Sequence, residues 1–156
     1  MQTTKTTFKL VTFKSLNISD IDTVVKMMED FYAIDDYQFE TEIANKLFLE
    51  FLENENLGKC WLIYNYVDIV GYAIITYVFS FEYKGKIAFF EELFINKSAR
   101  GKGIGKLAID FVKDEAEKSN LKMLYLEVEN HNKIAQKLYK ANGFKIHNRQ
   151  ILKLAT

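Results

Sequence analysis

The chain has 156 residues, the size of one ordinary domain that can bury a hydrophobic core. Its apolar fraction of 49% argues against an intrinsically disordered chain. Basic and acidic residues balance at 21 each, and this zero net charge argues against a broad nucleic-acid surface, which needs a strong positive field.

The cysteine content and the hydropathy pattern indicate the compartment. A single cysteine, Cys60, excludes an internal disulfide and fits a reducing environment, and we expect its thiol to be buried and structural. No apolar run approaches the ~20 residues of a membrane span, and the polar N-terminus lacks the apolar core of a signal peptide. We therefore expect a cytoplasmic protein without a membrane segment.

The first half of the chain predicts a strand, two helices and a strand pair. Ser19 is a candidate helix cap, because acidic residues follow it and favour the positive end of the helix dipole. Apolar residues then recur at helical spacing up to Tyr32, and Gly58 ends the second helix. In order, we expect a strand over residues 8–13, helices over 20–32 and 40–54, and strands over 60–67 and 69–81, with a tight turn near Asp68.

The second half predicts alternating strands and helices. An apolar stripe at i, i+3, i+4, i+7 runs from Ile104 to Ala116. Asn130 is a candidate cap for the last helix, and Gly143 is well placed to end it. We expect a strand over 87–95, a helix over 104–118, a strand over 121–128, a helix around 134–139 and one or two strands within 145–154. Together the elements make one α/β domain over residues 1–156 with a mixed sheet.

The most informative stretch lies between the expected strand 87–95 and the helix that begins at Ile104. Residues 100–105 read Arg-Gly-Lys-Gly-Ile-Gly. The glycines leave the backbone bare, and the first N–H groups of a helix have no internal partner. With the helix dipole and the nearby basic side chains, these groups predict a cradle for a phosphate or pyrophosphate. A plain turn at the start of a helix is the alternative.

The glycine spacing excludes two common phosphate motifs. A P-loop requires Gly-x-x-x-x-Gly-Lys-Ser/Thr, and a dinucleotide fingerprint requires Gly-x-Gly-x-x-Gly near the first strand of its unit. Here the glycines are spaced Gly-x-Gly-x-Gly, about two thirds of the way along the chain. The remaining pattern is Arg-x-x-Gly-x-Gly between a strand and a helix.

That pattern resembles the pyrophosphate loop of the GNAT superfamily of N-acetyltransferases. A second motif adds to the likeness: residues 126–132 read Leu-Glu-Val-Glu-Asn-His-Asn, Tyr139 follows Asn132 by seven residues, and Gly143-Phe144 comes next. The resemblance covers roughly residues 70–144. Within it, residues 90–95, Phe-Glu-Glu-Leu-Phe-Ile, look like the diamine N-acetyltransferase branch.

The resemblance implies a fold and a cosubstrate. The fold is a mixed, mostly antiparallel, twisted sheet with flanking helices and a parallel strand pair that splays apart. The cosubstrate is acetyl-coenzyme A, whose pantetheine arm would enter the gap as a pseudo-strand, with the Leu93 amide polarising the acetyl carbonyl. The implied contacts are backbone groups of Leu93, Phe94 and Ile95, the loop formed by Arg100, Gly101, Lys102, Gly103, Ile104, Gly105 and Lys106, and the side-chain amide of Asn132.

The resemblance also implies a base and an acid. An alkyl amine with a pKa of about 10.4 is neutral in only about one part in 2,500 at pH 7, so its proton must be removed. Glu91 matches the family's acidic position and Glu92 is the second choice, since strand alternation sends neighbours to opposite faces unless a bulge re-aims them. Tyr139 matches the general acid, because a phenol is protonated at neutral pH. Exposed strand-edge carboxylates and a packed aromatic ring are the structural alternatives.

The acceptor is less well defined. The resemblance favours a small polyamine-like or amino-acid-like amine, with a protein lysine or α-amine as the alternative, and a homodimer by analogy. A non-catalytic acyl-coenzyme A module is the rival, although it would need neither Glu91 nor Tyr139. Two histidines and one cysteine have no metal-binding spacing, so no metal is expected. Only 12 residues follow Phe144, so the family's final strand pair must be short.

Overall fold

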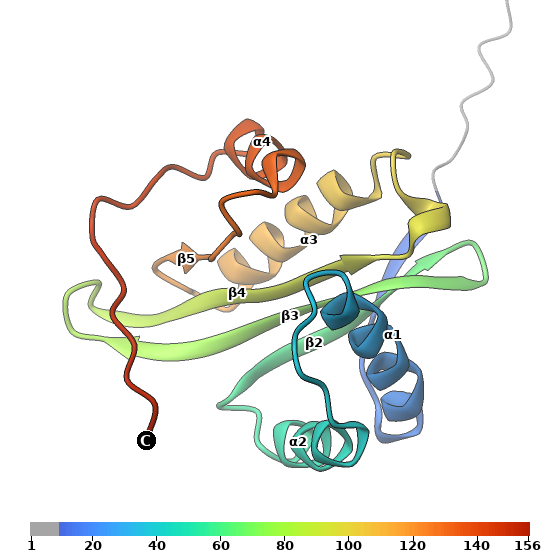
Figure 1. The fold of residues 1–156 in the computed structure, drawn as a ribbon. Coiled ribbons are helices and arrows are strands. Elements are labelled where there is room, and N and C mark those ends of the chain that lie inside the picture. The colour runs from blue at the N-terminus through green and yellow to red at the C-terminus, as the bar shows by residue number, and fades with distance from the viewer. Residues whose placement is uncertain (1–9) are drawn as a thin grey trace, which may run out of the picture.

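The computed structural model describes residues 10–156, which form a sheet with helices on both faces (Figure 1). No helix in this range has the length and apolar character that crossing a bilayer requires. The strands are β1 (Val11–Ser15), β2 (Gly58–Asn65), β3 (Asp68–Ser80), β4 (Gly85–Ile95) and β5 (Leu124–Tyr125); the helices are α1 (Ile21–Ala33), α2 (Thr41–Glu53), α3 (Ile104–Lys118) and α4 (Lys133–Ala141), with short 3₁₀ turns η1 (Ile18–Asp20) and η2 (Lys97–Ala99).

Within the described range the five strands follow the order β1-β2-β3-β4-β5 across the sheet. Strands β1 to β4 are antiparallel neighbours, whereas β5 runs parallel to β4 after the crossover through α3. Figure 1 shows α1 and α2 on one face of the sheet, and α3 and α4 on the other. The prediction of a mixed, mostly antiparallel sheet with flanking helices is confirmed.

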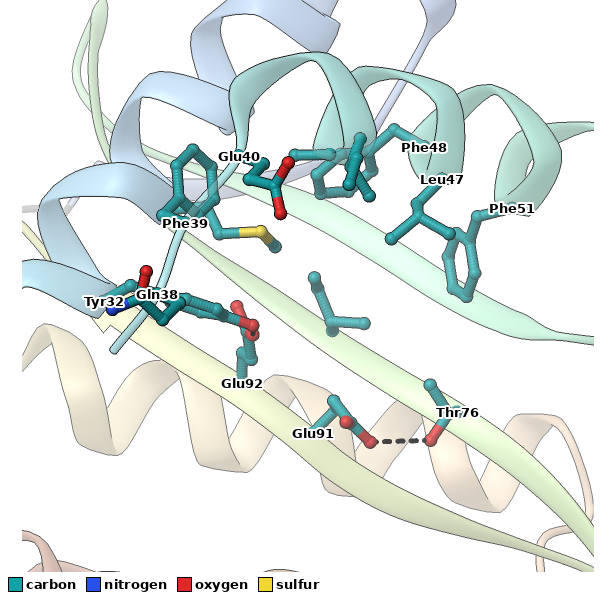
Figure 2. Close-up of a pocket in the computed structure, with 14 residues that line it drawn as sticks. Tyr32, Gln38, Phe39, Glu40, Leu47, Phe48, Phe51, Thr76, Glu91 and Glu92 are labelled. Carbon is teal, nitrogen blue, oxygen red and sulfur yellow. Dashed lines mark hydrogen bonds between the residues drawn. The ribbon is translucent and has the colours of Figure 1, made fainter. Parts of the chain in front are cut away.

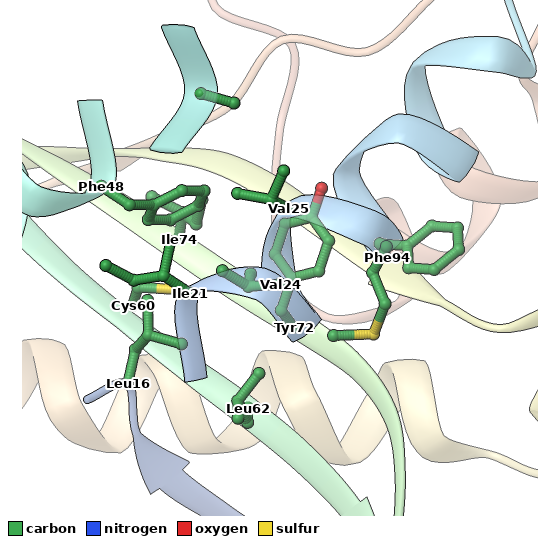
Figure 3. Packing of buried hydrophobic residues seen from close by; sticks show 12 residues of the cluster. Leu16, Ile21, Val24, Val25, Phe48, Cys60, Leu62, Tyr72, Ile74 and Phe94 are labelled. Carbon is green, nitrogen blue, oxygen red and sulfur yellow. The ribbon is translucent and has the colours of Figure 1, made fainter. Parts of the chain in front are cut away.

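Alternating strand residues fill the two hydrophobic layers. On the α1/α2 face, Tyr72, Ile74 and the Cys60 thiol are buried with the apolar stripe of α1 (Figure 3). On the α3 face, the intervening residues Ala73 and Ile75 pack against α3. Because successive side chains of a strand point to opposite faces, one strand supplies both layers. Burial raises the pKa of the Cys60 thiol, so the expected inert, buried cysteine is confirmed.

Strands β4 and β5 separate soon after they meet. Their parallel ladder joins only Ala88 to Leu124 and Phe89 to Tyr125, whereas β4 continues to Ile95. The expected strand 121–128 is therefore shorter than predicted, because the chain leaves the β4 edge after Tyr125. Between Phe90 and Ile95 that edge has no strand partner among residues 10–156. This is the splayed parallel pair that the family resemblance implied.

A β-bulge interrupts the β3–β4 ladder. Ile74 pairs with Glu92, but its neighbour Ile75 pairs with Phe90, so Glu91 is an extra residue on β4. The extra residue shifts the alternation by one position, and Glu92 and Phe94 come to lie on the α1/α2 face. Glu91 and Glu92 both line a cavity on that face. The two carboxylates therefore share one face instead of being divided between two.

The C-terminal segment differs from prediction. The one or two strands expected within 145–154 do not form: residues 145–156 contain neither strand nor helix. A new strand needs a partner edge, and the two-residue β5 offers too short a ladder at this side of the sheet. A bidentate ion pair between Arg149 and Glu82, with N–O distances of 2.8 and 2.6 Å, holds the segment beside the β3–β4 turn.

Two predicted caps are also corrected. The helical region begins with η1, where the Asn17 amide donates to the Asp20 carboxylate at 3.0 Å, so Ser19 is not its cap. Helix α4 is capped by Asn132, whose Oδ1 accepts from the Ala135 amide at 3.0 Å, and not by Asn130. The first strand runs to Ser15, two residues beyond its predicted end. Phe8, predicted at its start, lies outside the described residues.

Candidate active site

A cavity of about 340 Å³ lies between helices α1 and α2 and strands β3 and β4 (Figure 2). Its polar groups come mainly from the bulged part of β4 and from the segment that joins the two helices. Its apolar wall comes mainly from α2. The apolar lining residues are Met28, Phe39, Ile43, Ala44, Leu47, Phe48, Phe51 and Ile74.

Glu92 is held by two tyrosine hydroxyls in this cavity. Tyr32 donates to Oε1 and Tyr72 donates to Oε2, each at 2.7 Å. Burial raises the pKa of the Glu92 carboxyl, and the two hydrogen bonds lower it without cancelling the effect of burial. Burial, and after it the Glu92 carboxylate, raises the pKa of both tyrosine hydroxyls. Glu92 is therefore a carboxylate with both oxygens occupied and a fixed orientation.

Glu91 occupies the bulge and is more exposed than Glu92. The Thr76 hydroxyl donates to Oε2 of Glu91 at 3.0 Å, as the dashed line in Figure 2 marks. Among residues 10–156, no donor bonds the other carboxylate oxygen. Glu91 is thus oriented through one oxygen and has the second available for a ligand.

Tyr139 lies on the opposite face of the same stretch of β4. Its ring packs edge-on against Phe90, with centroids 6.4 Å apart, and against Phe144 at 5.7 Å. Burial raises the pKa of the Tyr139 phenol to about 12. No group within residues 10–156 forms a hydrogen bond with its hydroxyl. The phenol is therefore a protonated donor that no described partner occupies.

The glycine loop lies at the end of β4. Gly101 and Gly103 adopt φ angles of 73° and 80°, a left-handed conformation that favours glycine, and Gly103 is the N-cap of α3. A Cβ at Gly101 would meet no atom within 4 Å, so the backbone there borders open space. The first helical bond runs from the Leu107 amide to the Gly103 carbonyl. In the described chain, the amides of residues 104–106 therefore have no acceptor.

The third glycine has a packing role. A Cβ at Gly105 would lie 3.1 Å from Cδ2 of Leu138, so this glycine lets α4 approach α3 closely. Gly105 has an ordinary helical backbone and its φ is not in the left-handed region. The motif thus combines two conformational glycines with one that serves helix packing.

The basic side chains of the loop differ in their hydrogen-bond and ion-pair partners. Arg100 turns back toward β4, where its Nε donates to the Ile95 carbonyl at 2.8 Å and its guanidinium lies 5.8 Å from the Phe94 ring centroid. Lys106 forms an exposed ion pair with Asp110 at 2.6 Å. Lys102 has no ion-pair partner among residues 10–156. The terminal guanidinium nitrogens and the Lys102 ammonium are therefore the available cationic groups.

The last residues of β4 present backbone groups to the gap. The Asn96 amide donates to the Val70 carbonyl at 2.7 Å, so Asn96 faces β3. Alternation then directs the backbone groups of Ile95 and Leu93 toward the free edge, and those of Phe94 toward β3. The Ile95 carbonyl is taken by Arg100, whereas Leu93 has no strand partner on that side in the described chain.

Asn132 stands across the gap at the start of α4. Its Oδ1 is used in capping the helix, which leaves its side-chain NH₂ as the group able to contact a ligand. Asn132 is exposed, and no acceptor within residues 10–156 bonds its Nδ2.

Comparisons with known proteins agree with this geometry. A family model described as the acetyltransferase (GNAT) family matches residues 24–144. The chain belongs to the GNAT acetyltransferase family. A curated relative, an uncharacterised N-acetyltransferase of Bacillus subtilis (strain 168), is 32% identical over 77 residues, which cover 49% of this chain and 52% of the relative.

Two further comparisons extend the match. Thialysine N-epsilon-acetyltransferase of Bos taurus is 33% identical over 122 residues, which cover 76% of this chain and 65% of that protein. The matched region thus spans about half to two thirds of the length of the two curated relatives. The crystal structure of an integron cassette protein from the mobile metagenome of Cole Harbour Salt Marsh is 29% identical, with a TM-score of 0.83, covering 92% of this chain and 89% of that one.

Sequence reasoning missed three residues of this candidate site. Tyr32, Tyr72 and Thr76 hold the two carboxylates, yet none was singled out. The period of two along β3 puts Tyr72 and Thr76 on one face, so this signal was present in the sequence. Tyr32 lies 60 residues from Glu92, and no local pattern links them.

The sequence analysis also did not predict two contacts between loops that are far apart in the chain. Asp35, which follows α1, lies 2.9 Å from Nε2 of His131, just before α4. Tyr37 donates a hydrogen bond to the carboxylate of Glu129 in the same two loops. The segment between α1 and α2 is therefore fastened to the segment between β5 and α4. The His131 side chain is exposed.

Proposed function

We propose that the chain is an N-acetyltransferase that moves an acetyl group from acetyl-coenzyme A to a primary amine by direct attack. The observation that carries the proposal is the arrangement along β4. One strand has the bulged carboxylates at its middle, an unpaired edge beyond them, and a bare glycine loop with free helix amides at its end. Donor and acceptor sites would therefore meet along a single strand.

The residues present fit coenzyme A. The free amides of residues 104–106 and the left-handed glycines before them suit a pyrophosphate, because they offer hydrogen bonds and the positive end of the α3 dipole. Lys102 and the terminal nitrogens of Arg100 would add charge. The free edge of β4 suits the amide-bearing pantetheine arm, and Asn132 could reach the arm from the other side of the gap. The Leu93 amide would donate to the acetyl carbonyl as negative charge develops there.

Glu91 would act as the base. The neutral amine attacks the acetyl carbonyl carbon, a C–N bond forms, and the C–S bond breaks to release a thiolate. Glu91 would take the proton from the ammonium, directly or through water, because one of its oxygens has no described partner. Both oxygens of Glu92 accept from tyrosines, so Glu92 would add negative potential that attracts the ammonium.

Tyr139 would act as the acid. Burial raises the pKa of its phenol to about 12, so the hydroxyl keeps its proton throughout the neutral range. It lies beside Phe90, one residue before the bulge, on the side of the sheet from which α3 and α4 reach the gap. Donation from this hydroxyl would convert the leaving thiolate into the free thiol. The proton that the attacking nitrogen loses as the amide forms would restore the phenol, so the net proton released is the one that Glu91 takes.

A small-molecule amine is the proposed acceptor. Both carboxylates line a cavity between two helices and the sheet, which suits a small amine better than an extended peptide. The relative from Bos taurus is named for transfer to the ε-amine of thialysine, a name that favours the same class. A protein lysine or α-amine would need an open groove leading to Glu91.

A non-catalytic acyl-coenzyme A module is the competing hypothesis. It would retain the loop but would have no use for an oriented Glu91 or for a Tyr139 hydroxyl that no described group occupies. Calorimetry with acetyl-coenzyme A tests binding, and thiol release with a panel of primary amines then tests transfer. Absence of binding by folded protein would overturn both hypotheses. Binding without amine-dependent thiol release would favour the module.

A further inference from the structure

We propose that two loops form a strap that crosses the free edge of β4 and shields the acetyl end of the cosubstrate from water. The strap consists of residues 35–37, which follow α1, and residues 129–131, which precede α4. This inference rests on the proposed function and adds to it a part of the site that neither β4 nor the glycine loop supplies.

Two side-chain contacts close the strap. The Asp35 carboxylate lies 2.9 Å from Nε2 of His131, and the Tyr37 hydroxyl donates to the Glu129 carboxylate. The partners are 96 and 92 residues apart in the sequence. The contacts therefore join two parts of the chain that no local structure connects.

Each half of the strap is also supported by its own helix. The Tyr37 amide donates to the Tyr32 carbonyl in the last turn of α1 at 3.0 Å, and the two rings lie edge to face. On the other side, the Gln136 side chain of α4 donates to the carbonyls of Glu129 and Asn130 at 2.9 and 3.1 Å. Because this support does not depend on the opposite half, closing the strap costs less conformational entropy.

The strap passes around the free edge of β4. Helix α1 lies on one face of the sheet and α4 on the other, so loops attached to these helices can meet only past an edge (Figure 1). The edge is that of β4, because Tyr32 of α1 donates to Glu92 and Tyr139 of α4 packs against Phe90. Strand β5 has its last ladder pair with β4 at Phe89. The strap therefore crosses the gap beside residues 90–92.

This crossing point fits the acetyl end of the bound cosubstrate. The glycine loop follows Ile95, so a pantetheine arm that runs from the loop along the edge to Leu93 would bring its thioester next to the strap. The pyrophosphate would remain outside the strap. Residues 38–40, which follow its first half, line the cavity proposed for the amine. The strap thus lies where the donor and acceptor sites meet.

A closed strap would favour the amine over water. Water that reached the acetyl carbonyl carbon would form a C–O bond and break the C–S bond, releasing acetate and the thiol of coenzyme A. Excluding water from a reactive acyl group prevents this side reaction. Opening the strap should therefore increase thiol release in the absence of any amine.

Tyr37→Phe tests this expectation, because it removes the hydroxyl and keeps the ring beside Tyr32. Thiol release from acetyl-coenzyme A without amine should rise about fivefold, the effect of one hydrogen bond on the balance between open and closed strap. Tyr66→Phe is the matched control, since Tyr66 lies in the β2–β3 turn and is 58% exposed, against 53% for Tyr37. An unchanged rate in Tyr37→Phe would overturn the inference.

A charge exchange tests the second contact. His131→Glu brings a carboxylate against that of Asp35 and should raise amine-independent thiol release at least as much as Tyr37→Phe. Adding Asp35→Lys restores opposite charges and should return the rate to within about twofold of the parent. If Asp35→Lys does not reduce the effect of His131→Glu, the two residues act separately and the strap is wrong.

Hydrogen exchange gives a readout without turnover. In the protein without cosubstrate, Tyr37→Phe should speed amide exchange in residues 35–37 and 129–131 together, because each half loses its partner. Acetyl-coenzyme A should slow exchange in both halves of the parent. If folded protein does not bind acetyl-coenzyme A, the proposed function fails. If it binds and Tyr37→Phe speeds exchange in neither half or in only one, the strap alone is wrong.

Discussion

The hydroxyl of Tyr72, a residue with no exposed surface, donates a 2.7 Å hydrogen bond to Oε2 of Glu92. Burial raises the pKa of Glu92 above its ordinary value, although Tyr72 and Tyr32 oppose the shift. Between the unfolded pKa, about 4.3, and the higher folded value, the folded chain holds a proton that the unfolded chain has lost. The free energy of unfolding should therefore fall as pH rises through this window.

Tyr72→Phe should widen that window and lower stability. Without its donor, the Glu92 carboxylate is less stabilised, so its folded pKa rises further and stability is lost over a longer pH range. At pH 7 we expect a loss of about 1.5–3 kcal/mol, the usual size for a hydrogen bond to a charged group. Urea unfolding of the parent and the variant from pH 4 to 8 measures this loss in the free energy of unfolding. In a Glu92→Gln background the pH dependence should disappear, and an equal loss at pH 4 and 8 would contradict the assignment.

Glu91→Gln should reduce activity most at neutral pH. Loss of a positioned base costs about 10²–10⁴ in rate, but the need for a base declines as the free amine becomes abundant near pH 10. A pH profile of kcat/KM should therefore show the variant approaching the parent at high pH. The control is Glu50→Gln, at an exposed position of α2 outside the cavity. It should leave the pH profile of kcat/KM unchanged. A pH-independent deficit would remove Glu91 as the base.

Tyr139→Phe should separate turnover from binding. The ring contacts with Phe90 and Phe144 remain, so stability and acetyl-coenzyme A affinity should change little. The leaving thiolate loses its proton donor, and kcat should fall by about 10²-fold or more. Stopped-flow thiol release and calorimetry give the two quantities. Unchanged kcat would assign Tyr139 to packing alone.

Alanine at two glycines should produce different losses. Gly103→Ala forces a side chain into a φ of 80°, and should lower the free energy of unfolding by about 1–2 kcal/mol and weaken acetyl-coenzyme A binding. Gly105→Ala gains helix propensity of about 1 kcal/mol, which offsets the 3.1 Å approach to the movable end of Leu138. Chemical denaturation and calorimetry compare the two. Equal effects on binding would show that the backbone conformation of the loop does not matter.

The glycine loop shows how far the sequence could be read. Its position between a strand and an amphipathic helix, its left-handed glycines and its free amides all follow from local rules about glycine and helix ends. The same rules do not distinguish Gly105, whose role depends on Leu138 in another helix. They also do not predict that Arg100 folds back onto the Ile95 carbonyl.

The C-terminal segment shows where pattern reading failed. Apolar residues within 145–154 predicted strands, but a strand exists only where another edge accepts its hydrogen bonds. In this chain β5 forms only two ladder pairs, so it offers residues 145–154 too short a strand to pair with. Strand propensity is a property of the segment's own residues, whereas strand formation also requires a neighbouring strand to accept its hydrogen bonds.

The sequence by itself determined the order of elements, the start of α3 and the residue types gathered along β4, because these depend on neighbours a few positions apart. Only the tertiary structure decided that Glu91 and Glu92 share one face, since a bulge arises from the unequal lengths of two paired strands. It also brought Tyr32 and Tyr72 to Glu92, and a pKa depends on the charges, donors and water that folding puts around a group.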